Sequence, residues 1–418
     1  MTSTSVASAL QNALEPLLRG ALPVRLTAWD GSTAGPVGAP GVTLVGPDVL
    51  RRFLWHPGEL GAAQSYVTGE LKVDGSLIDA LRHVRRIADE RDLTGHRPSP
   101  RQVATALRAV VGVSGRPRRP SAPGSQIRIR GRLHTRRRDR DVIHHHYDLP
   151  AEFFRLILDD TMAYSCAHVT GAALEGTETD SYRLEDAQAD KLDLICRSVG
   201  LDARSGMRLL DVGCGWGSLG LFAAQHYAAR VTGVTISPEQ KAFIDRRVAD
   251  FGLSDRVTIR LQDYRDVDDR PYDAVASLEM GEHAGDRGYP DFVRTLRRNA
   301  AVGARVLVQQ MSRRGRHPGG GPFIEAFIAP DMTMRPLGRT IELIERGGLE
   351  VLQTRSLRAD YAWTIRAWRG RFEAHREQIR VLVGDEVVRV WELYLAGGEL
   401  AFEQGRMGVD QIVAARTR

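Results

Sequence analysis

This sequence of 418 residues is poor in cysteine and has no long apolar run. Its three cysteines, Cys166, Cys196 and Cys214, are too few and too scattered to predict a disulfide framework or a zinc site, so we expect no bound metal. No stretch of about 18 apolar residues occurs, which argues against a membrane-spanning helix. Residues 1–8 lack a basic stretch followed by an apolar core, so no export signal is predicted. These absences favour a globular protein of the reducing cytoplasm.

Positive charge is in excess and is concentrated in one stretch of the chain. Lysine and arginine number 58 against 52 acidic residues, which gives a formal net charge of +6. Ten arginines lie between Gly115 and Arg140, where the first acidic residue is Asp139. Such a block predicts an anionic partner, either nucleic acid or a phospholipid surface, although a solvated Arg-rich linker would carry the same pattern.

The first 90 residues predict a small α+β domain. Strand patterns occur at 24–30 and 42–45, and helical spacing of apolar residues occurs at 47–55 and 77–88. No catalytic group of side chains is evident in this part. We therefore expect it to be structural or to contact lipid.

Two further parts follow in the chain. Residues 91–138 are rich in proline and arginine and predict a linker, interrupted by a short helix at 103–111. Residues 139–418 alternate strand and helix patterns, which predicts a doubly wound, mostly parallel sheet. In such a sheet ligands bind at the carboxyl ends of the strands, where we expect Asp211, Thr235, Asp263 and Glu282 to gather.

A glycine turn after the first strand of that sheet predicts a cofactor cradle. The apolar run that ends at Asp211 is followed by Gly213, Gly215 and Gly217, and a helix pattern begins at Ser218. Glycines permit a tight turn and let a ligand approach the backbone. The spacing is neither that of a dinucleotide-binding fold nor that of a phosphate loop. It resembles the first motif of class I S-adenosylmethionine (SAM) methyltransferases.

Seven segments occur in the order in which one enzyme family carries them. They are His146–Leu149, Met162–Ala167, Glu185–Gln188 with Lys191, Asp211–Gly217, Val234–Gln240, Gln262–Asp266 and Met280–His283. With these segments the chain resembles the cyclopropane-fatty-acyl-phospholipid synthase family, which includes the mycolic acid cyclopropane synthases. The resemblance covers about 140–415 and extends more weakly into the N-terminal part through 64–70.

The resemblance implies a class I SAM methyltransferase domain at 139–418 that transfers a methyl group to a cis double bond of a phospholipid acyl chain. It also implies a peripheral location on the inner face of the membrane, reached through the Arg-rich linker. The residues that it places against SAM are Tyr164, Ser165, Asp211, Gly213, Gly215, Gly217, Thr235, Gln240, Gln262 and Asp263.

Members of that family bind a bicarbonate ion as the base near the reacting carbon, and Cys166, Glu282 and Tyr361 match its ligands. Each match has a structural alternative, namely an inert buried thiol, a turn cap and a core residue. Gln309 stands where the family usually has a histidine, and glutamine can neither hold positive charge nor shuttle a proton. The bicarbonate site is therefore in doubt.

This departure at Gln309 favours a different product. Within the wider family are enzymes that place a methylene or methyl branch on oleoyl chains instead of closing a cyclopropane ring. We favour the methylene product, with a separate reductase as partner for a saturated methyl branch, and cyclopropane formation as the alternative. A homodimer is left open.

Two other functions compete with lipid methylation. A nucleic-acid methyltransferase would explain the arginine block, but the Asp/Asn-Pro-Pro-aromatic tetrapeptide of amino-methylating enzymes is absent after the strand at 272–277, where Glu279–Glu282 stands instead. A non-catalytic lipid-binding protein would keep the fold without the chemistry, but the intact glycine turn, Thr235 and Gln240 argue against such decay. We therefore expect no nucleic-acid partner.

Overall fold

The computed structural model describes residues 4–116, 118–128, 131, 133–146, 149–269, 271–314 and 319–418. Their contacts group the chain into two compact units. Unit 1 comprises Met1–Gln126, Gly321–Phe327 and Val383–Leu400, and unit 2 comprises Ile127–Gly320, Ile328–Leu382 and Ala401–Arg418.

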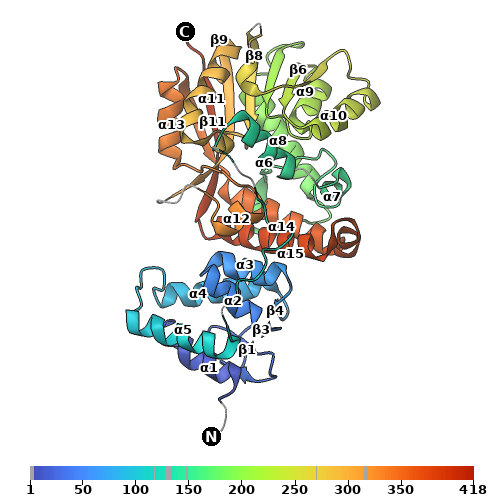
Figure 1. The fold of residues 1–418 in the computed structure, drawn as a ribbon. Helices are drawn as coiled ribbons and strands as arrows, with labels where there is room; N and C mark the ends of the chain where they lie inside the picture. The colour runs from blue at the N-terminus through green and yellow to red at the C-terminus, as the bar shows by residue number, and fades with distance from the viewer. Residues whose placement is uncertain are drawn as a thin grey trace. The chain divides into compact units, whose positions relative to one another are not determined.

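Unit 1 is a small α+β body with a mixed sheet of four strands, and its N-terminal residues are drawn in blue and cyan in Figure 1. The strand order is β2-β1-β3-β4, with β1 parallel to β3 and the other two pairs antiparallel. The strands are β1 (Arg25–Thr27), β2 (Thr33–Ala34), β3 (Gly41–Leu44) and β4 (Leu71–Val73). The helices are α1 (Val6–Leu14), α2 (Asp48–Trp55), α3 (Glu59–Val67), α4 (Leu77–Glu90), α5 (Pro100–Ser114) and the later α12 (Pro322–Phe327).

The units do not follow the three ranges expected from the sequence. The range predicted as a linker supplies α5, which is longer than the helix expected at 103–111 and begins at a capping box of Ser99 and Gln102 with Pro100 in its first turn. α5 packs on the core of unit 1 through Val110 and Val113. Pro100 therefore stands in the first turn of α5, where a proline is tolerated, and does not prevent the helix from forming.

Unit 2 contains the α/β fold expected from the sequence. Its sheet has seven strands in the order β10-β11-β9-β8-β5-β6-β7. The pairs from β9 to β7 are parallel, and β11 pairs antiparallel with both β9 and β10. The strands are β5 (Arg208–Val212), β6 (Arg230–Thr235), β7 (Val257–Leu261), β8 (Tyr272–Leu278), β9 (Ala300–Arg313), β10 (Glu350–Ser356) and β11 (Met407–Ala415).

Helices cover both faces of this sheet (Figure 1). α8 (Leu184–Ser198), α9 (Ser218–His226) and α10 (Pro238–Asp250) lie on one face, and α11 (Gly285–Asn299) and α13 (Leu337–Arg346) lie on the other. The remaining α-helices of unit 2 are α6 (Arg136–His146), α7 (Ala151–Arg155) and α14 (Arg358–Ala374). The helix α15 (Arg376–Glu403), interrupted at Gly384, is divided between the units, because Val383–Leu400 belongs to unit 1. Within the described residues, no helix has both the length and the apolar character needed to cross a bilayer.

The topology of the sheet places the functional site. β5 lies between β6 and β8, so the order of the strands reverses on the two sides of β5. A crevice opens at such a switch point beyond the carboxyl ends of the strands. The glycine turn follows β5 at this point, and the segments after β6, β7 and β8 end beside it.

Candidate functional site

The glycine turn has the backbone that a cofactor cradle requires. Gly213, Gly215 and Gly217 have φ angles of +77°, +53° and +86°, which are left-handed values that L side chains disfavour. The N–H groups of Gly213 and Cys214 both donate to the carbonyl of Val234 on β6, which ties the turn to the sheet. A Cβ atom at Gly215 would meet no atom within 4 Å, so the backbone there faces open space.

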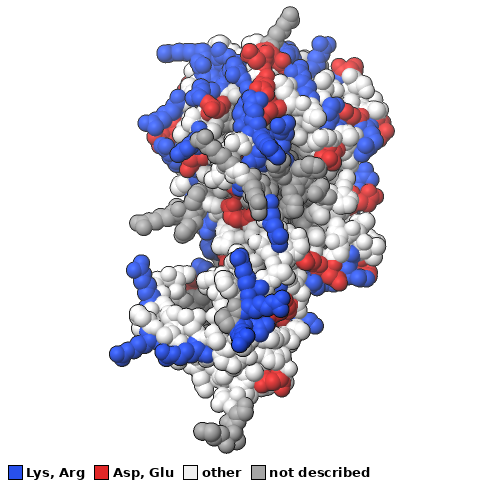
Figure 2. All heavy atoms as spheres, in the orientation of Figure 1, with Lys and Arg blue, Asp and Glu red and all other residues white. Residues whose placement is uncertain are grey.

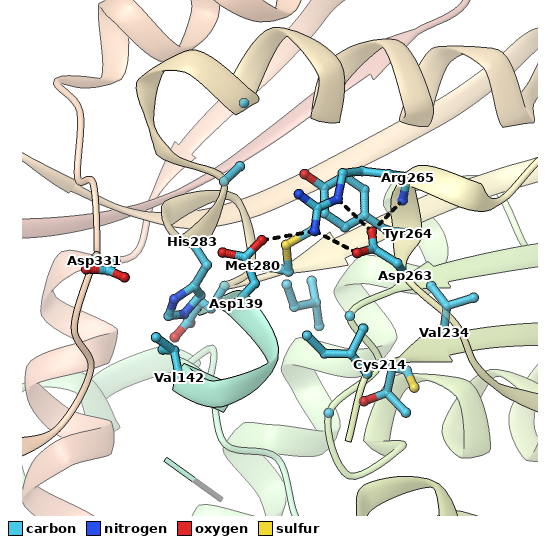
Figure 3. A pocket seen from close by; sticks show the side chains of 18 of the residues that line it. Asp139, Val142, Cys214, Val234, Asp263, Tyr264, Arg265, Met280, His283 and Asp331 are labelled. Carbon is cyan, nitrogen blue, oxygen red and sulfur yellow. Dashed lines mark hydrogen bonds and ion pairs between the residues drawn. The ribbon is translucent and has the colours of Figure 1, made fainter. Parts of the chain in front are cut away.

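That open space is a cavity of about 1060 Å³ in unit 2. The cavity lies at the carboxyl ends of β5 to β8, and α6 also contributes to its lining (Figure 3). Among the described residues that line it are nine of the ten that the sequence placed against SAM: Tyr164, Ser165, Asp211, Gly213, Gly215, Thr235, Gln240, Gln262 and Asp263. Gly217 is the exception, because it caps α9 and faces Ile244.

Polar groups in this cavity are partly pre-arranged. Thr235 donates its hydroxyl hydrogen to Oε1 of Gln240 at 2.7 Å, and the buried Nε2 of Gln240 has no hydrogen-bond partner in the protein. An unpaired buried donor beside an open glycine turn fits a ligand with hydroxyl or carboxylate acceptors. These residues therefore suit the ribose and amino-acid portions of SAM.

Arg265 joins the cavity wall to α6. It donates to both oxygens of Asp263, at 2.8 and 2.6 Å, and to Asp139 at 2.9 Å, as Figure 3 shows. Burial opposes ionisation of Asp263, but the hydrogen bonds from Arg265 outweigh it and hold the pKa of Asp263 below its ordinary value. Asp139 and Asp263 are thus held together through one guanidinium.

Part of the arginine block is occupied by contacts within unit 2. Arg136 pairs with Asp266 at 2.5 Å, and Arg138 pairs with Asp331 at 2.5 Å, with both Arg138 and Asp331 mostly buried. These pairs hold α6 beside the cavity, so Arg136 and Arg138 are not simply a free cationic surface. Of the other residues singled out in the sequence, Arg130, Arg132, Tyr147 and Asp148 lie outside the described residues.

One carboxylate stands at the centre of the predicted catalytic side chains, and it belongs to Glu279. Its Oε1 accepts hydrogen bonds from the backbone N–H of Cys166 at 2.8 Å and from Nε2 of Gln309 at 2.9 Å. Its Oε2 accepts the hydroxyl hydrogen of Tyr361 at 2.8 Å. Glu279 lines the cavity, whereas Cys166, Gln309 and Tyr361 are buried behind it. The structure thus brings three of the four predicted catalytic residues around a fourth group that was not predicted.

Glu282 lies close by but makes a different contact. Its Oε1 accepts the backbone N–H of Met311 at 2.9 Å, and the side chain is fully buried. Burial raises the pKa of Glu282 to about 8, and the neighbouring charge of Glu279 adds to this rise. Burial also raises the pKa of Glu279, although its three hydrogen bonds and the charge of Lys191 oppose the rise.

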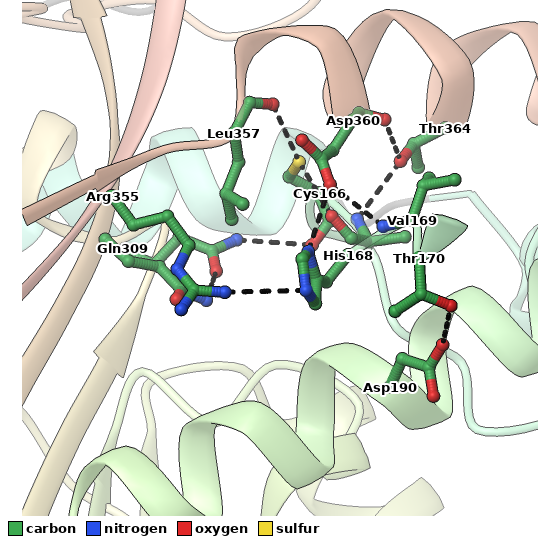
Figure 4. Close-up of polar contacts among 12 residues, drawn as sticks. Cys166, His168, Val169, Thr170, Asp190, Gln309, Arg355, Leu357, Asp360 and Thr364 are labelled. Carbon is green, nitrogen blue, oxygen red and sulfur yellow. Dashed lines mark hydrogen bonds and ion pairs between the residues drawn. The ribbon is translucent and has the colours of Figure 1, made fainter. Parts of the chain in front are cut away.

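Gln309 and Cys166 have defined roles in this cluster. Gln309 donates to Glu279 and to the carbonyl of Cys166 at 3.3 Å, while its own Oε1 accepts from Gln411 at 2.9 Å. The thiol of Cys166 donates to the carbonyls of Ala167 and Leu357, as Figure 4 shows for Leu357. Burial raises the pKa of this thiol well above its ordinary value. Cys166 therefore acts on Glu279 through its backbone and not through a thiolate.

The loop that carries Cys166 is held from two sides. On α8, Lys191 donates to Oγ of Ser165 at 2.8 Å, and Gln188 donates to the carbonyls of Ala163 and Ser165. On α14, side-chain oxygens of Thr364 and Asp360 accept the N–H groups of Ala167 and Val169 (Figure 4). These contacts keep the N–H of Cys166 directed at Glu279.

Sequence reasoning missed Glu279, although a signal was present. Glu279 directly follows β8, at the carboxyl end of a central strand, where α/β enzymes place reactive side chains. The structure adds a second signal, because Glu279 has a φ angle of +50°. A non-glycine residue in this region is strained, and such strain is typical of functional sites.

No metal cluster accompanies the site within the described part of the chain. No group of three or more His, Cys, Asp and Glu side chains there is arranged to hold a metal ion. The three cysteines are buried free thiols.

Comparisons with known proteins agree with this geometry. The family model described as mycolic acid cyclopropane synthetase matches residues 134–412. The chain is 34% identical over 403 residues to the tuberculostearic acid methyltransferase UfaA1 of Mycobacterium tuberculosis, which covers 93% of this chain and 87% of the relative. It is 30% identical over 370 residues to the cyclopropane-fatty-acyl-phospholipid synthase of Escherichia coli K12, which covers 88% of this chain and 86% of that relative.

A solved structure supports the same assignment. The mycolic acid cyclopropane synthase CmaA1, crystallised with S-adenosylhomocysteine (SAH) and CTAB, superposes with a TM-score of 0.60 at 30% identity and covers 66% of this chain and 98% of that one. The chain therefore belongs to the mycolic acid cyclopropane synthetase family and is a SAM-dependent methyltransferase that acts on fatty acids or lipids.

Proposed function

We propose that this enzyme methylates the cis double bond of a phospholipid acyl chain and forms a methylene-branched product. Both a tuberculostearic acid methyltransferase and a cyclopropane synthase are among its relatives, so family membership leaves the product open. The observation that carries the proposal is the position of Glu279, a carboxylate that lines the cavity and is hydrogen-bonded by Cys166, Gln309 and Tyr361.

Glu279 supplies the base that this reaction requires. When bound, SAM supplies an electrophilic methyl group that the alkene carbons can attack. Attack leaves a carbocation on the neighbouring carbon, and a negative carboxylate at the cavity wall stabilises it. The reaction ends when Glu279 takes a proton from the substrate.

Glu279 also makes a bicarbonate ion unnecessary. In the resembled family, residues matching Cys166, Glu282 and Tyr361 surround bicarbonate. Here Cys166 and Tyr361 instead donate to the Glu279 carboxylate, which satisfies these two donors. Gln309 fits this arrangement, because its neutral amide donates a hydrogen bond to the Glu279 carboxylate. Unlike a protonated histidine, an amide cannot transfer a proton to that carboxylate.

The hydrogen bonds to Glu279 favour the methylene product. A buried carboxylate that accepts from three donors is a weaker base than the same buried group without them, since each donor stabilises its ionised form and opposes the rise in pKa that burial causes. Proton removal is then slow enough for a hydride to move from the methylated carbon to the cationic carbon. The cation now lies on the methylated carbon, and Glu279 removes a proton from the added methyl group. The electron pair of that C–H bond forms the exocyclic double bond.

An anionic membrane surface is the proposed location of the substrate, and α5 of unit 1 is suited to contact it. Val103, Leu107 and Val111 are 38%, 48% and 39% exposed and lie four residues apart on one line of the helix. Arg101 and Arg108 are exposed on the same helix. An exposed apolar line beside basic side chains is typical of helices that lie on anionic lipid.

The deciding experiment is mass spectrometry of the product that purified protein forms from an oleoyl phospholipid and SAM. We expect an exocyclic methylene chain, which a separate reductase could convert to a methyl branch. Glu279→Gln should reduce turnover by about 10²–10⁴-fold, the range for loss of a general base. Glu345→Gln, at an exposed glutamate of α13 that does not line the cavity, is the matched control and should retain turnover. A cyclopropane as sole product would refute the proposed product, and full activity of Glu279→Gln would refute the proposed base.

A further inference from the structure

A second cavity of unit 2 lies between α11 and α13 and is separate from the methyltransferase site. Its volume is about 620 Å³. Its lining includes Pro290, Leu343 and Gly347. The other residues that line it are all arginines: Arg294, Arg297 and Arg298 from α11, and Arg339 and Arg346 from α13.

Carboxylates compensate only part of this charge. Arg294 pairs with Asp291, Arg339 and Arg346 share the single carboxylate of Glu342, and Arg298 lies 3.8 Å from Asp268. Among the described side chains, five guanidinium groups thus face three carboxylates, which leaves an excess of two positive side-chain charges. Figure 2 shows basic side chains gathered on the part of unit 2 where Figure 1 draws α11 and α13.

Two of these arginines are fixed in place by the backbone. Arg297 donates to the carbonyl of Gly348 at 3.1 Å and to the main-chain oxygen of Arg418 at 3.0 Å. Arg298 donates to the carbonyl of Val267 at 2.7 Å. A guanidinium has five N–H donors, so these bonds orient the groups and leave further donors for a ligand. Pre-oriented donors lose little entropy on binding.

A solvated helix face explains only part of this arrangement. α11 and α13 bury Phe292, Leu296 and Ile344 in the core, so polar residues are expected on their outer faces. Two arginine-bearing helices that face each other across a concavity, however, repel one another in the absence of an anion. Guanidinium groups on opposite walls match the several oxygens of a phosphate group, which accept paired N–H donors.

We propose that this groove binds a phosphate-bearing anion. The phosphate has two chemical sources, a phospholipid headgroup at a membrane surface and a soluble phosphate or pyrophosphate compound. The groove does not include the residues of the methyltransferase site, so the proposal stands apart from the product of the reaction.

Calorimetric titration of the full-length protein with sodium pyrophosphate tests the proposal, and sedimentation with phosphatidylglycerol or phosphatidylcholine vesicles distinguishes the sources. We expect pyrophosphate to bind at low salt and to bind more weakly as salt is added. The double variant Arg294→Gln with Arg346→Gln should lose affinity by roughly tenfold or more for each guanidinium. Arg197→Gln with Arg256→Gln removes two other exposed, paired arginines of unit 2 and should bind as the unmodified protein does.

The outcomes distinguish the two sources of the phosphate. Loss of both pyrophosphate and phosphatidylglycerol binding in the groove variant supports a lipid headgroup, and loss of pyrophosphate binding alone supports a soluble ligand. Absence of pyrophosphate binding, or equal loss in both double variants, would overturn the proposal. Methyl transfer to detergent-dispersed oleoyl phospholipid, measured on the same variants, should be retained. These measurements thereby distinguish a loss of anion binding in the groove from a loss of the proposed methyl-transfer reaction.

Discussion

The hydroxyl of Tyr361 on α14 donates to Oε2 of Glu279 across 2.8 Å, although the two residues are 82 positions apart in the chain. Tyr361 is almost fully buried, whereas Glu279 reaches the cavity. This contact, together with those of Cys166 and Gln309, keeps the carboxylate of Glu279 at the wall of the cavity. It follows that the chemistry of this enzyme should respond to the ionisation of one side chain of its own.

Tyr361→Phe should therefore change the pH dependence of methyl transfer. Glu279 acts as a base only when ionised, so the rate rises as pH increases through its pKa, which burial places above the ordinary value of a glutamate. Removal of the Tyr361 hydroxyl takes away a donor to the ionised form and raises that pKa further. The acidic limb of the profile of kcat should move to higher pH, and part of the rate should return at alkaline pH.

Tyr227→Phe is the matched control for that measurement, because Tyr227 donates to Asp193 away from the cavity. Its pH profile should equal that of the unmodified enzyme. An acidic limb that stays in place in Tyr361→Phe would contradict the role of Glu279 as base.

Gly215→Ala should weaken SAM binding and should lower stability by only about 1–2 kcal/mol. A Cβ atom at this position enters open space of the cavity, and its left-handed φ angle adds a strain of about 1–2 kcal/mol. Gly213 is a poorer test, since a Cβ atom there would lie 2.8 Å from Cγ of Met280. Calorimetry should show the loss of SAM affinity. Unchanged affinity in a folded Gly215→Ala protein would remove the turn from the cofactor site.

Gly217→Ala provides the contrast within the same turn. Its Cβ atom would lie 2.8 Å from Cγ2 of Ile244, away from the cavity. This variant should lose stability in urea unfolding, and SAM affinity of the fraction that stays folded should change less than in Gly215→Ala.

Glu282→Gln should make the protein more stable at alkaline pH. The pKa of Glu282 is about 8 in the folded protein, against an ordinary value of 4.5. The protonated form is favoured by folding, so its contribution is complete below about pH 4.5 and is lost as pH rises through 8. The amide keeps an acceptor for Met311 and never ionises. Urea unfolding at pH 5 and pH 8 should show that the advantage of the variant grows with pH.

Proton linkage limits how much the free energy of unfolding can change with pH. The free energy of unfolding changes by at most about 1.4 kcal/mol for each pH unit per proton. Asp211, whose pKa burial raises to about 7, contributes a similar decline in both proteins and cancels in the difference. Exposed Glu345→Gln is the control and should show no such trend. A pH-independent difference between Glu282→Gln and the unmodified protein would refute the prediction.

Replacement of Leu107 and Val111 by Gln should weaken binding to anionic vesicles. These side chains form the exposed apolar line of α5, and each contributes roughly 1–2 kcal/mol when it enters the lipid interface. Val302→Gln changes an exposed apolar side chain of unit 2 and serves as control. Co-sedimentation with phosphatidylglycerol vesicles should fall for the α5 variant alone. If the α5 variant instead changes the oligomeric state and leaves vesicle binding intact, a second copy of the chain covers this face.

The sequence by itself predicted the parts of this protein that depend on local order. Period-two and period-3.6 patterns indicated the alternating strands and helices of unit 2, and the spacing of Gly213, Gly215 and Gly217 indicated a turn open to a ligand. Nine residues from separate motifs line one cavity, because the carboxyl ends of parallel strands meet at one edge of a sheet. Such relations follow from chain order and sheet geometry.

Only the tertiary structure decided which carboxylate meets Gln309 and Tyr361. Glu279 and Glu282 are three residues apart, and their spacing cannot tell them apart. The side chain of Glu279, whose φ angle is left-handed, meets Gln309 of β9 and Tyr361 of α14, while Glu282 is directed to the backbone of Met311. Only the tertiary structure likewise decided the partners of Arg136 and Arg138, whose charges suggested an external anion. Their partners Asp266 and Asp331 lie 130 and 193 positions later, and such distant pairing arises only when the chain is folded.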